Sequence, residues 1–162
     1  MEKFKQMEEL QNLLRQNNET ITCAESCTGG LIASKITAIA GSSSIFKGSV
    51  VTYCNEIKEQ ELNVKKETMI KYGAVSTQTV DEMLKGVIKK FDSTYAIAVS
   101  GVAGPGGGTK DKPVGTVVIG IMKKNQNPQS WVFSFNGGRN EVQEAAANMA
   151  FLKIFEIFFK NP

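Results

Sequence analysis

The order of residue types over residues 20–39 constrains the fold of this chain more than any other feature. TITCA (20–24) is short and β-branched, which is typical of a buried strand. ESCTGG (25–30) predicts a turn, and LIASKITAI (31–39) predicts a helix that ends near Gly41. A strand that leads through a glycine turn into a helix favours an open sheet covered by helices.

Strands and helices continue to alternate along the rest of the chain. The loop KKNQNPQ between the last two predicted strands is short, so these strands are expected to be antiparallel. Asn55 and Thr77 are the expected N-cap residues of two helices. The predicted strands cover 20–24, 47–54, 95–104, 114–122 and 130–135, and the predicted helices cover 3–17, 31–39, 56–62, 66–73, 78–91 and 140–159.

These elements predict a single domain over residues 1–162. The expected architecture is α/β: a three-layer α/β/α sandwich around a mixed, mostly parallel sheet of about five strands. The last predicted helix carries a long apolar face. We expect this face to pack in the core or against a second copy of the chain, which would make a homodimer.

The absence of histidine limits the possible chemistry. None of the 162 residues is histidine, which excludes Ser-His-Asp and Cys-His catalysis and any zinc site built on histidine. An acid–base step must therefore use Lys, Tyr, Asp, Glu or a thiol. Three cysteines are also too few for a zinc site made of four sulfurs. No metal site and no cofactor are expected.

Charge and cysteine content exclude further classes. Nineteen basic and 16 acidic residues give a net charge of +3, which is weak for a nucleic-acid-binding surface. No apolar run reaches the roughly 18 residues of a membrane span. The N-terminal segment is charged and amphipathic, unlike a secretory signal. An odd number of cysteines (Cys23, Cys27 and Cys54) then indicates reduced thiols and a cytoplasmic protein.

Ser26 is the first candidate catalytic residue, because it lies where a predicted strand ends and a helix begins. Ligands of open α/β sheets bind at such places, and free N–H groups around Thr28, Gly29 and Gly30 would favour an oxyanion or a phosphate. Ser26 could thus be a nucleophile. Cys27 is a lesser alternative, since a helix start lowers the pKa of a thiol. The simpler interpretation of the motif alone is a helix N-cap, for which serine is a preferred residue.

Lys58 is the candidate base. Without histidine, a partly buried lysine with a lowered pKa can deprotonate a serine hydroxyl. Tyr53 lies five residues earlier and could relay the proton or orient the lysine. The simpler interpretation is an aromatic residue in the core and a solvated lysine on a helix.

Two loops and one arginine are candidate ligand contacts. The loop SGVAGPGGGT (100–109) exposes many backbone amides, as at Gly101, Gly104 and Gly106, and Ser100 adds a hydroxyl, so the loop either holds a phosphate or a carboxamide or is a flexible turn. Ser42 and Ser43 lie in a hydroxyl-rich turn that either binds the ligand or ends a helix. Arg139 precedes the last helix and either pairs with a phosphate or lies on the surface.

Four motifs in this order resemble the CinA C-terminal domain family. They are AESCTGGLIAS (24–34), GSSSIFKGSVVTYCNEIK (41–58), YGAVS (72–76) and SGVAGPGGGTKDKPVGTV (100–117). The resemblance covers residues 5 to 159 approximately. The chain looks like the stand-alone members, the nicotinamide-nucleotide amidases of the PncC type, because 162 residues leave no room for the extra N-terminal domain of the larger members.

The resemblance implies a fold similar to anticodon-binding domains and a metal-independent Ser–Lys hydrolase. The implied reaction converts the carboxamide of nicotinamide mononucleotide to nicotinate mononucleotide and ammonia, in pyridine-nucleotide recycling. The family nucleophile falls on Ser26 and its partners on Lys58 and Tyr53. The resemblance adds Asn55 to the site and supports Ser100 and Arg139. The other reading is a non-catalytic nucleotide-binding or competence-associated regulatory module, which would release no ammonia.

The chain departs from the family pattern at four positions. Cys54 stands where the family more often has serine, and Ser100 where it has threonine. Gly138 and Gln143 lie near positions where the family more often has a polar residue and a second arginine. One positive charge is therefore missing near the expected phosphate site.

Overall fold

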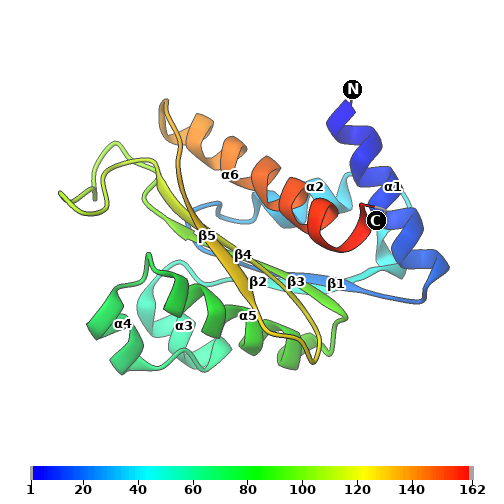
Figure 1. Ribbon diagram of the computed structural model, residues 1–162, viewed down its shortest axis with the longest axis horizontal. Coiled ribbons are helices and arrows are strands. Elements are labelled where there is room, and N and C mark those ends of the chain that lie inside the picture. The colour runs from blue at the N-terminus through cyan, green and yellow to red at the C-terminus, as the bar shows by residue number, and fades with distance from the viewer. Residues whose placement is uncertain (1, 161–162) are drawn as a thin grey trace.

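The structure, a computed structural model, describes residues 2–160 and contains one mixed sheet of five strands (Figure 1). The strand order is β2-β1-β3-β4-β5. β1 pairs in parallel with β2 and β3, whereas β4 is antiparallel to both β3 and β5. This confirms the predicted mixed sheet and the antiparallel last pair. The strands are β1 (Ile21–Glu25), β2 (Phe46–Val51), β3 (Tyr95–Gly101), β4 (Thr116–Lys123) and β5 (Gln129–Ser134).

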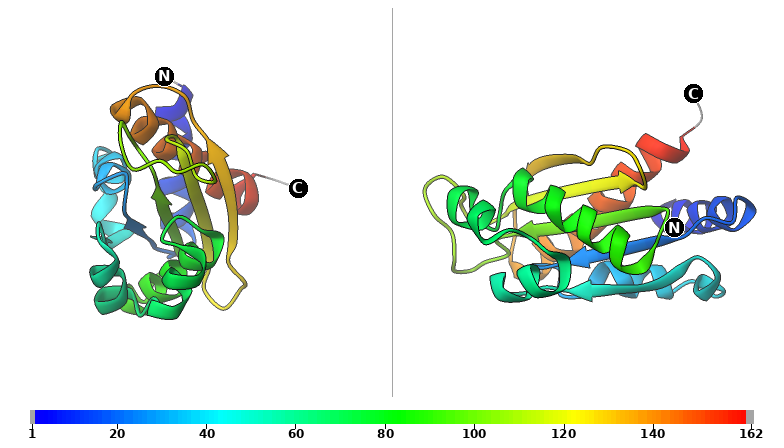
Figure 2. Two further views of the ribbon diagram at one scale, coloured as in Figure 1. Left: turned by 90° about the vertical axis from the view of Figure 1, so that its left-hand side faces the viewer. Right: turned by 90° about the horizontal axis from the view of Figure 1, so that it is seen from below.

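Helices cover both faces of the sheet, which makes the predicted three layers (Figures 1 and 2). α1, α2 and α6 lie on one face, and α3, α4 and α5 lie on the other. Within residues 2–160, no helix is long and apolar enough to cross a membrane. The helices are α1 (Glu2–Gln16), α2 (Leu31–Thr37), α3 (Asn55–Leu62), α4 (Lys66–Tyr72), α5 (Thr77–Phe91) and α6 (Arg139–Ile154).

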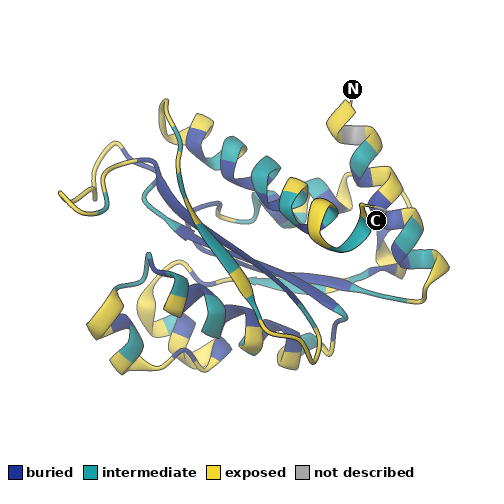
Figure 3. Cartoon of the chain, viewed as in Figure 1, coloured by how far each residue is buried: buried dark blue, intermediate teal, exposed yellow. Residues whose placement is uncertain are grey.

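The three central strands, β1, β3 and β4, are buried on both faces because alternate residues face different helix layers, whereas the edge strands β2 and β5 are partly exposed (Figure 3). Ile97 packs in the cluster formed with α1, α2 and α6, and its neighbour Ala98 packs in the cluster formed with α5. Gly120 of β4 allows α5 to approach closely, since a Cβ atom there would lie 2.6 Å from a methyl carbon of Val80. The apolar face of α6 is used inside the chain, where residues such as Val142 and Ile154 are fully buried.

Helix ends differ from the predictions by one or a few residues. Ser76, not Thr77, caps α5, because its Oγ accepts the N–H of Thr79 at 3.1 Å. Asn55 is the first residue of α3 rather than its cap, and Cys54 precedes it without a side-chain capping bond. The last helix ends as an α-helix at residue 154 and continues as a π-helical turn over 155–159.

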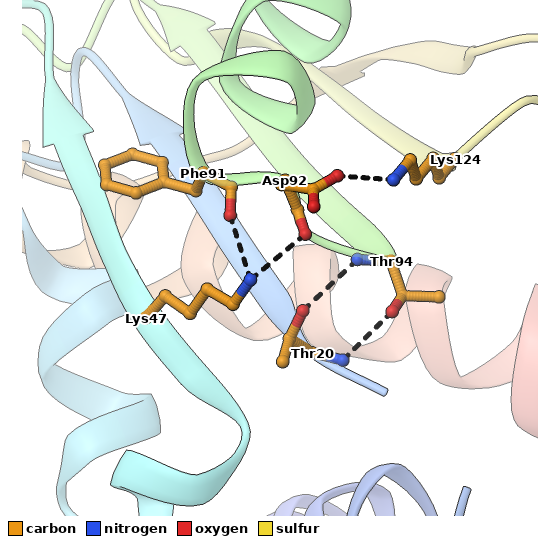
Figure 4. Close-up of polar contacts among 6 residues, drawn as sticks. All are labelled: Thr20, Lys47, Phe91, Asp92, Thr94 and Lys124. Atoms are coloured by element: carbon orange, nitrogen blue, oxygen red, sulfur yellow. Dashed lines mark hydrogen bonds and ion pairs between the residues drawn. The ribbon is translucent and has the colours of Figure 1, made fainter. Parts of the chain in front are cut away.

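A polar network lies at the end of the sheet where β1 and β3 begin (Figure 4). The N–H of Thr20 donates to Oγ1 of Thr94 at 3.1 Å, and the N–H of Thr94 donates back to Oγ1 of Thr20 at 3.3 Å. Lys47 donates to the carbonyl of Asp92 at the end of α5, and Lys124 pairs with the Asp92 carboxylate. The candidate site lies at the opposite end of the sheet, where β1 and β3 end.

Candidate active site

Ser26 follows β1 directly, at the place where the chain topology leaves an opening. The connection from β1 to β2 passes through α2 on one face, and the connection from β2 to β3 passes through α3, α4 and α5 on the other. Ligands of α/β sheets bind where the connections diverge in this way. The N–H of Ser26 donates to the carbonyl of Val99 at 3.1 Å, which ties the serine to the end of β3.

Lys58 reaches Ser26 from α3. Its Nζ lies 3.1 Å from Oγ of Ser26 and donates to the carbonyl of Thr52 at 2.7 Å. Lys58 is only 1% exposed, so the interpretation as a solvated helix lysine is wrong. Burial lowers the pKa of Lys58 below its ordinary value. Within residues 2–160 no carboxylate lies within ion-pair distance of the amine to oppose that shift.

Glu25 organises the turn that carries Ser26. Its carboxylate is fully buried and lies at the end of β1. Oε1 accepts the Thr28 hydroxyl at 2.6 Å and the N–H of Ile32 at 2.8 Å, and Oε2 accepts the N–H of Ala33 at 3.0 Å. Glu25 therefore occupies the N-terminus of α2, which the sequence had suggested as a place for the ligand's anion.

The remaining free N–H groups lie in the residues that follow, which we call the serine turn (residues 26–30). The N–H of Gly29 donates to the carbonyl of Ser26 at 3.0 Å and is therefore engaged. The N–H groups of Cys27, Thr28 and Gly30 have no acceptor among the described residues 2–160. These three groups, rather than the helix end, are available to a developing oxyanion.

Cys27 is held as a structural residue. Burial is the main reason that the pKa of its thiol rises to about 12, which outweighs any effect of the nearby helix start. The thiol is then protonated at neutral pH, which argues against the alternative of a Cys27 nucleophile. Gln143 of α6 donates from Nε2 to the Cys27 carbonyl at 2.9 Å. Gln143 thus fastens the serine turn to α6.

Tyr53 and Arg139 meet across the mouth of the cleft. Nη2 of Arg139 donates to the Tyr53 hydroxyl at 2.5 Å, and Nη1 donates to the carbonyl of Gly104 at 2.7 Å. Tyr53 is 58% exposed. The structure brings Tyr53 to Arg139, whereas it brings Lys58 directly to Ser26.

A cleft of about 230 Å³ lies between Ser26 and the loop of residues 100–109, the glycine loop. This loop follows β3 and projects beyond the sheet, at the left of Figure 1. The side chains of the candidates Lys58, Thr28 and Ser100 are buried and do not line the cleft, and the Thr28 hydroxyl is turned to Glu25. The lining residues are Ser26, Cys27, Tyr53, Gly101, Val102, Ala103, Gly104, Gly106, Gly107 and Arg139.

Of the other candidates, Gly29 and Gly30 belong to the serine turn but do not line the cleft, and Ser42, Ser43 and Asn55 lie away from it. Ser42 and Ser43 form a 3₁₀ turn just before β2. β2 is parallel to β1, with Phe46 beside Ile21, so this turn lies at the edge where the strands begin and Ser26 lies where they end. The expectation that these serines line the same cleft of one chain is therefore wrong. Asn55 is exposed and lines a separate hollow between α3 and α4.

The sequence interpretation missed Glu25 as part of the site. Its only signal was a charged residue at the end of an otherwise uncharged strand, directly before Ser26. No sequence pattern indicated the contacts of Gln143 with Cys27 or of Lys58 with Thr52, because these contacts join separate elements. Within residues 2–160, no three His, Cys, Asp or Glu side chains gather into a group that could hold a metal ion.

Comparison with known proteins identifies similar sequences. Residues 3–158 match the family described as the CinA C-terminal domain. A CinA-like protein of Endomicrobium trichonymphae is 53% identical over 138 residues, which are 85% of this chain and 32% of that protein. A CinA-like protein of Petrotoga mobilis is 43% identical over 159 residues, which are 98% of this chain and 39% of that protein. The chain thus spans about a third of the length of these relatives.

Solved structures share the fold. The competence/damage inducible protein CihA from Agrobacterium tumefaciens has a TM-score of 0.93 and 35% identity, covering 96% of this chain and 95% of that one. The competence damage-inducible protein A (ComA) from Klebsiella pneumoniae has a TM-score of 0.92 and 32% identity, covering 98% of this chain and 99% of that one.

Proposed function

The chain belongs to the CinA C-terminal domain family, and we propose that it is an amidase that hydrolyses the carboxamide of nicotinamide mononucleotide. The products are nicotinate mononucleotide and ammonia. The observation that carries this proposal is the 3.1 Å contact between Nζ of a buried lysine and Oγ of a serine at the floor of a cleft. A lysine with a lowered pKa beside a serine is the arrangement that a histidine-free acyl transfer needs.

Lys58 starts the reaction as a neutral amine. One of its N–H bonds donates to the Thr52 carbonyl, which directs its lone pair towards the Ser26 hydroxyl. Lys58 takes the hydroxyl proton while Oγ of Ser26 attacks the carboxamide carbon. Free N–H groups of Cys27 and Thr28 stabilise the oxyanion that forms.

Collapse of this intermediate releases ammonia. The Lys58 ammonium gives its proton to the leaving nitrogen, the C–N bond breaks, and an ester to Ser26 remains. Lys58, neutral again, takes a proton from a water molecule that attacks the ester carbon. The C–O bond to Ser26 then breaks, the serine regains its proton from Lys58, and nicotinate mononucleotide leaves.

Arg139 supplies positive charge at the mouth of the cleft for the phosphate of the substrate. A guanidinium has five N–H donors, and the contacts with Gly104 and Tyr53 use only one on each of two nitrogens. The remaining donors can bind phosphate oxygens. Amide groups of the glycine loop at Gly106 and Gly107 line the same cleft.

The test is ammonia and nicotinate mononucleotide formation by the pure protein after EDTA treatment. Ser26→Ala is expected to lower kcat by about 10⁴-fold or more, since it removes the nucleophile. Ser34→Ala is the matched control, because Ser34 is exposed on α2. Near-normal turnover by Ser26→Ala would rule out the mechanism. A wild-type protein that binds the nucleotide without releasing ammonia would favour the non-catalytic binding module.

A further inference from the structure

Glu25 is a charged residue whose side chain is fully buried and hydrogen-bonded to the serine turn and to α2. Its side chain is fully buried, and no cation of residues 2–160 lies within ion-pair distance of it. A buried carboxylate without a cation is costly unless several donors compensate it. The compensation comes from the Thr28 hydroxyl and from the N–H groups of Ile32 and Ala33 at the start of α2.

These contacts make Glu25 the anchor of the serine turn on its inner side. Both carboxylate oxygens accept, so the side chain cannot rotate without breaking a bond to the turn or to α2. The backbone of Glu25 is also fixed, since its carbonyl accepts the N–H of Thr52 at 2.7 Å. Thr52 is the residue whose own carbonyl accepts from Lys58. Glu25 is therefore in contact with residues that hold both reacting side chains.

Gln143 anchors the same turn from the side of α6. It donates to the carbonyl of Cys27, while Glu25 holds the side chain of Thr28. The peptide group between Cys27 and Thr28 is thus fixed at both ends. In a trans peptide the N–H points opposite to the C=O. The N–H of Thr28 consequently points away from Gln143 and stays free of a protein acceptor in the described chain.

We infer that Glu25 is a positioning residue for the reaction: its carboxylate, together with Gln143, holds the serine turn so that Ser26 meets Lys58 and the N–H groups of Cys27 and Thr28 stay free for the oxyanion. The inference rests on the proposed function. The part that does not depend on the substrate is that the reactivity of Ser26 depends on the Glu25 carboxylate. Glu25 itself touches neither the substrate nor the reacting atoms.

The decisive variant is Glu25→Gln, which keeps the size of the side chain but turns one acceptor oxygen into an N–H₂ donor. That donor would face an N–H group of α2 and cannot accept from it. We expect kcat for nicotinamide mononucleotide to fall by about 10²–10³-fold, the range seen when one oxyanion donor is lost. KM is expected to stay close to the wild-type value, since Glu25 does not line the cleft.

A helix cap elsewhere supplies the matched control. Ser76 caps α5 by accepting the N–H of Thr79 and does not line the cleft. Ser76→Ala and Glu25→Gln both weaken a helix start, so both should lower the melting temperature. Only Glu25→Gln should lower kcat. Equal kcat values for the two variants would show that Glu25 is a structural cap and would overturn the inference.

Thr28→Val keeps the inference testable if Glu25→Gln does not fold. This variant has nearly the same shape and loses only the hydroxyl that donates to Glu25. We expect a smaller fall in kcat, about tenfold, with KM again little changed, because one of the two ties on the oxyanion peptide is lost. Wild-type kcat in Thr28→Val would contradict the inference.

A second readout separates this inference from the choice of substrate. A fluorophosphonate reacts with an activated serine, and the mass of the intact protein reports the adduct. The wild-type protein is expected to form one adduct, which Ser26→Ala abolishes and Glu25→Gln slows by at least tenfold. This result would support the inference even if nicotinamide mononucleotide were not hydrolysed. An unchanged adduct rate in Glu25→Gln, or no adduct with the wild-type protein, would overturn it.

Discussion

Replacing Lys58 by methionine tests the base directly. Methionine keeps most of the apolar stem of the lysine and removes the amine that lies 3.1 Å from Oγ of Ser26. Loss of a general base costs about 10²–10⁴-fold in rate, so kcat for ammonia release should fall within that range. KM should change little, because Lys58 is buried behind the cleft and does not line it.

The pH dependence of turnover supplies a second test of Lys58. The amine must be neutral to act, so wild-type kcat should rise with pH and level off above the pKa of Lys58. Burial lowers this pKa, so the plateau should be reached below pH 10.5, the ordinary value for a lysine. Lys58→Met should keep only a residual rate without this ionisation.

Stability should also depend on pH in a direction that the burial of Lys58 determines. The unfolded chain binds the Lys58 proton more tightly than the folded chain does, so wild-type stability should increase as the pH rises from the folded pKa towards 10.5. The increase is about 1.4 kcal/mol for each unit by which the two pKa values differ. Lys58→Met lacks this gain and leaves the Thr52 carbonyl without its donor, which costs about 1–3 kcal/mol at any pH.

The variant should therefore become less stable relative to the wild type as the pH rises from 7 to 10. Ammonia release across this range and urea unfolding at both ends measure the two effects. Lys89→Met is the control, since Lys89 is an exposed lysine on α5. The reasoning fails if Lys58→Met turns over nearly as fast as the wild type, or if the difference in unfolding free energy does not change with pH.

Two further predictions concern the rest of the fold. Gly86→Ala should strongly destabilise the protein in urea unfolding, because its Cβ would lie 2.1 Å from the carbonyl oxygen of Leu62. Gly106→Ala is the control and should be nearly neutral, since no atom lies within 4 Å of its Cβ. Equal urea midpoints for the two variants would contradict this. Lys124 lowers the pKa of Asp92, so the stability from this pair is present above about pH 4 and is lost as the pH falls through the lowered pKa. Stability curves of the wild type and Asp92→Asn should converge there; a constant gap would refute the pairing.

Much of the fold could be predicted from sequence because it rests on local patterns. The β-branched run before Ser26 and the other short apolar runs predicted the strands, and the helical spacing of the segments between them predicted the helices. The resulting mixed sheet of five strands is confirmed. Helix ends were less certain, because adjacent residues compete for the same cap. Ser76 and Thr77 can both accept an N–H bond, and only the backbone path of the turn decides that Ser76 does so.

In the candidate site, too, residue identities could be predicted from the sequence, whereas contacts between elements could not. Residue types made Ser26 and Lys58 candidates, since a chain without histidine leaves few nucleophile–base pairs, and the resemblance to the CinA family then assigned them the two roles. Local motifs could not predict distances between elements. Ser42 and Ser43 resemble ligand contacts in the sequence, yet the parallel pairing of β1 and β2 places them at the opposite edge of the sheet from Ser26.

The sequence by itself determined the elements, their order and the small set of groups able to do chemistry, because these depend on residue type and on neighbours along the chain. Tertiary structure alone decided which groups meet. It buried Lys58 against Ser26, turned Glu25 inwards onto α2 and brought Gln143 to the carbonyl of Cys27. Such contacts join residues 7 to 116 positions apart, and packing of the helices on the sheet sets their geometry.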